Sequence, residues 1–102
     1  MLIDVAAARR IAEEAAQQKL ERFLAEPDQP LLRDEFLEGA NCWFFFRDPA
    51  IVVPPQYALG AECAYAVSKR GAVRTIADFF SDKEKLDSYL KTMSDYFLTH
   101  DE

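Results

Sequence analysis

The stretch Cys42-Trp-Phe-Phe-Phe-Arg47 decides the fold, because four consecutive aromatic residues are poor helix material and good β-strand material. Successive strand residues point to opposite faces, so Trp43 and Phe45 face one way while Phe44 and Phe46 face the other. Both faces of this strand are therefore apolar. Either the strand is central and covered on both sides, or one face is left for a partner, and we expect the second arrangement.

The segments on either side of this strand predict its neighbours in an antiparallel sheet. Residues 31–38 fit a short helix that ends at Gly39, or a first strand that turns into the aromatic one. Residues 63–68 alternate as a strand and residues 72–76 return from it. Gly71 closes the turn between them, where glycine can adopt a positive φ. The sheet thus has three or four strands.

Helices are predicted at both ends of the chain. Residues 4–26 and 82–98 carry apolar side chains at helical spacing, and the first stripe is rich in alanine, so its axis can sit close to the sheet. Asp4 can cap the first helix, and Ser81 and Glu84 have the spacing of a capping box on the second. The prediction is an α+β fold, an antiparallel sheet with the N-terminal and C-terminal helices packed on one face.

Length and charge exclude several classes of protein. The chain has 102 residues, enough for one domain over 1–102. Eighteen acidic residues against twelve basic ones give a net charge of −6, which disfavours nucleic-acid binding. No apolar run reaches the ~20 residues of a membrane helix, and no secretory signal opens the sequence, so we expect a cytoplasmic protein without membrane contact.

Residues that carry chemistry are scarce. His100 is the only histidine and has no nucleophile or carboxylate constellation near it. Cys42 and Cys63 are expected as buried thiols rather than a redox pair, because antiparallel pairing would place Cys42 opposite Val67 or Ser68, out of disulfide range. We therefore expect no enzyme activity, no cofactor and no metal.

The connection over residues 48–61 is unusual for a loop. It contains three prolines, which make it stiff, and it is too apolar to be fully solvated. We expect part of it to lie against the sheet. The aromatic strand Trp43–Phe46, together with Tyr57 and Tyr65, could form a binding patch, since Trp and Tyr are enriched at interface hot spots. Plain core packing must account for at least one face of the strand.

A family resemblance covers about two-thirds of the chain. The aromatic strand after Gly39, the Val67-Ser-Lys-Arg-Gly-Ala-Val73 turn and the Leu-x-x-Tyr-Leu of the last helix (Leu86 to Leu90) resemble the immunity protein 35 (YrhB-like) family of small bacterial α+β proteins. Trp43 and Phe45 correspond to that family's W-x-F. The sequence departs from the family pattern at Pro54-Pro55, where the family usually has Gly-Asn-x-Pro. The resemblance favours a strand over residues 31–38.

The resemblance implies a role in which the protein binds and neutralises a cognate bacterial toxin by stoichiometric occlusion. An acidic surface would steer it to a basic protein. The predicted contact residues are Trp43, Asp48, Tyr57, Glu62 and Tyr65.

Other arrangements remain open at this point. The outer face of the last helix, with Glu84, Asp87 and Asp95, is the alternative interface. An exposed aromatic face is also compatible with a homodimer seam. The alternative function is a chaperone-like or general protein-binding module that covers apolar client segments.

Overall fold

The computed structural model describes residues 2–57 and 63–102, with only the backbone of Tyr57 and Cys63 included. The elements, in chain order, are α1 (Val5–Leu20), η1 (Glu21–Phe23), β1 (Leu32–Glu38), β2 (Cys42–Arg47), η2 (Pro55–Tyr57), β3 (Cys63–Ser68), β4 (Val73–Ala77) and α3 (Lys83–Thr99). They form an α+β fold, as the sequence predicts.

The four strands form an antiparallel meander in the order β1-β2-β3-β4. Residues 32–38 are a strand, which resolves the ambiguity of this segment. The aromatic strand β2 is central and pairs Trp43 with Val67 on β3. β1 is an edge strand, and its register against β2 shifts between Leu32 and Phe36. A break in the ladder on an edge strand discourages edge-to-edge pairing with another sheet.

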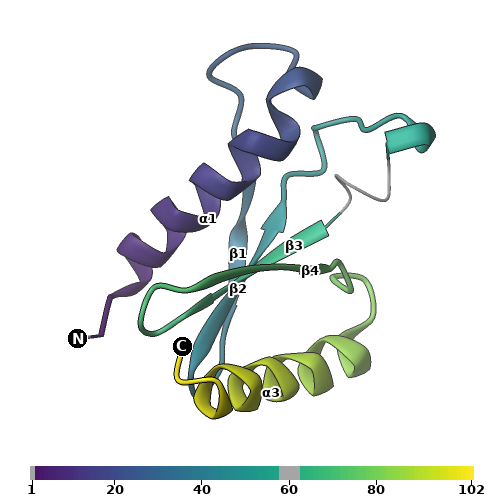
Figure 1. The fold of residues 1–102 in the computed structure, drawn as a ribbon. Helices are drawn as coiled ribbons and strands as arrows, with labels where there is room; N and C mark the ends of the chain where they lie inside the picture. Colours follow the sequence, from purple (N-terminus) through teal and green to yellow (C-terminus); the bar gives the residue numbers. More distant parts are fainter. Residues whose placement is uncertain (1, 58–62) are drawn as a thin grey trace.

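The two helices cover opposite faces of the sheet (Figure 1). Trp43 and Phe45 pack with α1, whereas Phe44 and Phe46 pack with α3. The prediction that both helices lie on one face is therefore wrong. A strand that is apolar on both sides must be covered on both sides, because each exposed ring would forfeit its hydrophobic stabilisation. One helix per face meets this need within the chain.

α1 approaches the sheet closely because its contact stripe is small. Ala8, Ala12 and Ala16 are completely buried against the sheet. Asp4 caps the helix as predicted, its Oδ1 accepting a hydrogen bond from the Ala7 N–H at 2.8 Å. The α-helix is shorter than the predicted 4–26, since regular α geometry ends at Leu20 and one 3₁₀ turn continues to Phe23.

α3 packs its apolar stripe against the second face of the sheet. Leu86, Met93 and Phe97 are its buried apolar residues. The predicted Ser81–Glu84 capping box is wrong by one residue, because Asp82 is the N-cap and its Oδ1 accepts from the Lys85 N–H at 3.2 Å. A carboxylate in this position also interacts favourably with the positive end of the helix dipole.

The β3–β4 turn has the predicted form. Gly71 has a φ of +97°, a conformation that side chains with a Cβ rarely adopt. Cys42 pairs with Ser68 and Cys63 pairs with Ala77, so the predicted separation of the two cysteines along the ladder is confirmed. Cys42 is a free, buried thiol.

Candidate partner-binding surface

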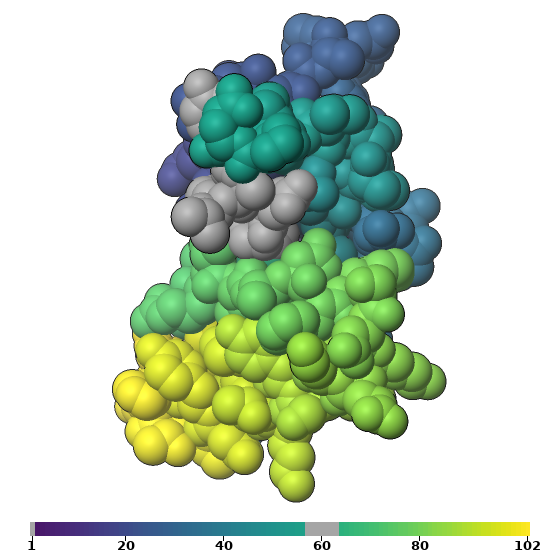
Figure 2. Space-filling view, turned by 90° about the vertical axis from the view of Figure 1, so that its right-hand side faces the viewer, coloured from purple at the N-terminus to yellow at the C-terminus, as the bar shows by residue number. Residues whose placement is uncertain are grey.

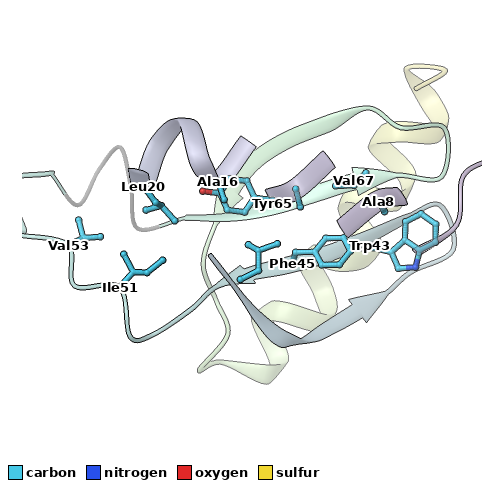
Figure 3. Close-up of a cluster of buried hydrophobic side chains, with 11 residues drawn as sticks. Ala8, Ala16, Leu20, Trp43, Phe45, Ile51, Val53, Tyr65 and Val67 are labelled. Atoms are coloured by element: carbon cyan, nitrogen blue, oxygen red, sulfur yellow. The ribbon is translucent and has the colours of Figure 1, made fainter. Parts of the chain in front are cut away.

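Trp43 and Tyr65, two of the predicted contact residues, are core residues. Trp43 is 4% exposed and Tyr65 is fully buried. Figure 3 shows both in one apolar cluster with Phe45 and the alanines of α1. They cannot touch a partner while the protein keeps this fold, so their assignment as contacts is corrected. Their size and aromatic character serve packing beneath α1.

The other three predicted contacts are only partly described. Asp48 is half-buried and shapes the turn after β2, because its Oδ1 accepts from the Ala50 N–H at 2.8 Å and its own N–H donates to the Leu31 carbonyl at 3.0 Å. Tyr57 ends the 3₁₀ turn η2, and its side chain lies outside the described part. Glu62 lies outside the described residues altogether.

The stiff loop after β2 contributes to the core, as predicted. Ile51 and Val53 are buried in the same cluster as Trp43 and Phe45 (Figure 3), whereas Val52 between them is 78% exposed. The loop therefore extends the cover that α1 gives this face. The expectation that a partner is needed to cover the face no longer applies.

The acidic residues concentrate on the segment that leads from α1 into the edge strand. Residues 21–38 carry six acidic and two basic residues, a net charge of −4 out of the total of −6. Five of the exposed residues of this segment are hereafter called the acidic edge: Glu26, Asp28, Asp34, Glu35 and Phe36. Glu21, Arg22 and Glu38 of the same segment are exposed as well. The α1–β1 connection projects at the end of the molecule away from α3 (blue, top of Figure 2).

Phe36 gives the acidic edge an apolar anchor. Its side chain is 41% exposed, and one face of its ring stacks on Phe45 with centroids 5.7 Å apart and planes at 29°. The stacking holds the ring in place, so a partner would lose little side-chain entropy by covering it. Phe36 lies on the edge strand β1, directly opposite Phe45 of β2.

The carboxylates of the acidic edge have no ion-pair partner among the described residues, in contrast to three basic side chains at the β3–β4 turn and on β4. Within the described part of the chain the ion pairs are Lys69–Glu38, Arg70–Asp101 and Arg74–Glu102. Arg9 donates to the Arg33 carbonyl at 3.1 Å. Asp34 and Glu35 have no ion pair among the described residues, so their field extends into solvent.

The alternative interface on α3 lacks such a field. Glu84, Asp87 and Asp95 are exposed as predicted. The helix also carries Lys83, Lys85 and Lys91, so Lys83–Thr99 has no net formal charge. A basic partner is therefore attracted more strongly to the acidic edge than to this helix.

The histidine of the sequence packs at the end of α3. The ring of His100 stacks on Tyr96 with centroids 4.1 Å apart, and its Nδ1 lies 2.8 Å from the Tyr96 carbonyl oxygen at the end of α3. No three His, Cys, Asp or Glu side chains cluster to hold a metal within residues 2–57 and 63–102. None of the helices described is long and apolar enough to span a membrane.

Sequence reasoning missed Phe36 as a surface residue. Its apolar character was visible, but its exposure follows from its position on the edge strand β1, and strand order cannot be read from a local pattern. The chain matches no protein-family model, no curated protein and no solved structure.

Proposed function

We propose that this protein is an immunity protein that neutralises a cognate bacterial toxin by binding it one to one through the acidic edge, in the cytoplasm and without chemistry of its own. The observation that carries the proposal is the pair of unpaired carboxylates, Asp34 and Glu35, that precede the half-exposed Phe36 on the edge strand. A charged rim around an aromatic anchor is the usual composition of a tight protein interface.

The carboxylates and the Phe36 ring of the acidic edge contribute to binding in different ways. Carboxylates with no internal partner attract a basic surface from a distance and raise the association rate. The Phe36 ring, already stacked on Phe45, then slows dissociation by burying apolar area. Toxins that act on nucleic acids or nucleotides have basic active sites, and an acidic inhibitor covers such a site by charge complementarity. The resemblance of the β2 strand and the β3–β4 turn to an immunity family supports the same role.

The chaperone-like alternative receives less support. Client capture needs a continuous apolar surface. The large apolar side chains that are exposed in the described part are Leu2, Val5, Phe36, Val52 and Leu98. Leu2 and Leu98 line one small hollow, whereas Phe36 belongs to β1 and Val52 to the loop after β2. This division among separate elements favours one specific partner over clients with long apolar segments.

The test is co-expression with the product of the adjacent open reading frame. We expect growth rescue and a one-to-one complex in gel filtration, with an association rate that falls as salt is added. Phe36→Ser should mainly raise the dissociation rate, and the double variant Asp34→Lys with Glu35→Lys should mainly lower the association rate, by about tenfold or more.

The matched control is Asp87→Lys on α3, which changes an exposed carboxylate far from the acidic edge in sequence. It should leave rescue and both rates unchanged. The proposed surface is wrong if Asp87→Lys weakens the complex as much as the edge variants do. The proposed function itself fails if no complex and no rescue appear with the unaltered protein.

A further inference from the structure

A hollow of about 280 Å³ opens at the end of the sheet where β1 begins and β2 ends. Its lining residues are Arg33, Arg47, Asp78, Phe80 and Ser81. The register explains the meeting of the two arginines, because Leu32 pairs with Arg47 and Arg33 is the next residue along the edge strand. The segment after β4 supplies the other three residues on its way to α3.

Each arginine is held in place by the fold. The Arg33 guanidinium carbon lies 4.0 Å from the centroid of the Phe80 ring. The Phe80 ring in turn packs edge-on against Phe46 in the core, with centroids 5.0 Å apart. Arg47 donates from Nη1 to the Ile51 carbonyl. Both side chains are therefore pre-organised, and a ligand that used them would not have to order them.

Each of the two guanidinium groups has a donor that no hydrogen-bond partner satisfies. The Nε atoms of Arg33 and Arg47 are buried and have no hydrogen-bond partner. Neither arginine forms an ion pair among the described residues, although the chain carries a net charge of −6. Half-buried cations without an anion are costly, since burial disfavours an unpaired charge. This pair contrasts with Lys69, Arg70 and Arg74, each of which has a carboxylate partner.

From this arrangement we propose that the Arg33–Arg47 hollow binds a phosphate-sized oxyanion. Guanidinium groups present planar forks of donors that match the oxygens of a phosphate. The Ser81 hydroxyl is a further donor on the rim. The hollow uses none of the acidic-edge residues, although Arg33 precedes Asp34 in the chain, so the proposal can be tested separately from the proposed function.

Asp78 gives the site a preference among oxyanions. One carboxylate oxygen, Oδ1, accepts a hydrogen bond from the Phe80 N–H at 2.9 Å. An ionised carboxylate is only an acceptor and repels a fully deprotonated anion. Phosphate retains a proton at neutral pH and can donate it to Asp78, whereas sulfate has none to donate. The hollow should therefore bind phosphate more tightly than sulfate.

The experiment is an NMR titration of the full chain with inorganic phosphate at neutral pH and constant ionic strength, with sulfate and chloride as comparison anions. The readout is the Nε–Hε resonance of each arginine. We expect saturable shifts for Arg33 and Arg47 but not for the exposed Arg10, and binding at least about tenfold weaker for sulfate. Arg47→Gln should weaken phosphate binding about tenfold or more, while Arg10→Gln should leave it unchanged.

A second variant tests the role of Asp78. Asp78→Asn removes the repulsion and supplies a donor, so sulfate should then bind about as well as phosphate. The proposal is overturned if phosphate shifts do not saturate, if chloride produces the same shifts, or if Arg10 responds equally. If Arg47→Gln unfolds by circular dichroism, the resonances of the unaltered protein and the anion selectivity of Asp78→Asn still decide the question.

Discussion

The ammonium of Lys69 lies 4.1 Å from the centroid of the Trp43 ring and pairs with the Glu38 carboxylate at the same time. Lys69 follows β3 and Glu38 ends β1, so this contact joins the two strands that flank β2 across the tryptophan. It closes the solvent side of a ring that the sequence alone presents as a binding residue. The ammonium itself lies over the ring, and the lysine side chain keeps 20% of its surface exposed.

Replacement of Lys69, which covers the Trp43 ring, should lower the stability of the fold by a measurable amount. Lys69→Gln loses the cation–π contact, which contributes about 0.5–1 kcal/mol at partly exposed sites. The free energy of unfolding from urea titration should fall by about this amount, and the Trp43 fluorescence maximum should shift to longer wavelength. Arg70→Gln, which breaks a more exposed ion pair on the same turn, should change stability by less. Equal losses in the two variants would contradict the role given to Trp43.

The ion pair also makes stability depend on pH. The hydrogen bond and the positive charge of Lys69 hold the pKa of Glu38 below its usual value of 4.5. A carboxyl whose pKa is lowered in the folded state stabilises the fold above the unfolded value, and this contribution is lost as pH falls through the folded value. The difference in unfolding free energy between the unaltered protein and Glu38→Gln should therefore be constant above about pH 5 and shrink at more acidic pH.

The matched control for this measurement is Glu35→Gln, on the same strand. Glu35 is exposed and has no ion pair within the described part of the chain. The difference in unfolding free energy between the unaltered protein and Glu35→Gln should not shrink at the acidic pH values where the Glu38→Gln difference does. A Glu38→Gln difference that persists unchanged down to the most acidic pH at which the protein folds would show that the Lys69 pair does not stabilise the fold.

The alanine stripe of α1 should not tolerate larger residues. Ala12 has no exposed surface and lies between the helix and the sheet, so Ala12→Leu must push α1 outward or force strained rotamers. We expect a loss of about 1–3 kcal/mol in chemical denaturation. Ala6→Leu, at an exposed position of the same helix, should change stability by less than about 0.5 kcal/mol. Comparable effects at both positions would argue against close packing of α1.

Glycine is required at position 39 because the backbone there lies too close to α3 for a side chain. A Cβ at this position would lie 2.6 Å from the Ser94 Oγ and 3.1 Å from Leu90, although no unusual backbone angle is involved. Gly39→Ala should cost about 1–3 kcal/mol through overpacking. The double variant with Ser94→Ala removes the closest atom, so its loss should be smaller than the sum of the two single losses. Strict additivity in urea unfolding would show that the contact is not the cause.

The Cys42 thiol should be unreactive in the folded protein. Burial raises its pKa above the usual value, which lowers the fraction of reactive thiolate. In a Cys63→Ser background, labelling by a disulfide reagent at mildly alkaline pH should be slow without denaturant and fast in urea. The rate should follow the population of the unfolded state as urea is added. Fast labelling of the native protein would mean that the Cys42–Ser94 contact opens readily.

The elements of this fold were predictable because their signals are local. Four aromatic residues in a row specify a strand, an alanine-rich stripe at helical spacing specifies α1, and a glycine marks the β3–β4 turn. Asp4 could be assigned as an N-cap for the same reason, since its partner is only three residues away. The N-cap of α3 is Asp82 rather than the predicted Ser81, because a sequence fixes the ends of a helix only to within one or two residues.

The sequence by itself determined which segments are helices and strands, apart from residues 31–38, and that the aromatic strand is apolar on both faces. Only the tertiary structure decided that one helix covers each face, which buries Trp43 and Tyr65, leaves Phe36 uncovered and places Arg33 beside Arg47. The physical reason is that propensity and periodicity act over a few residues. Exposure and the meeting of distant side chains depend on strand order and on which surface each helix covers, and these are properties of the whole packed chain.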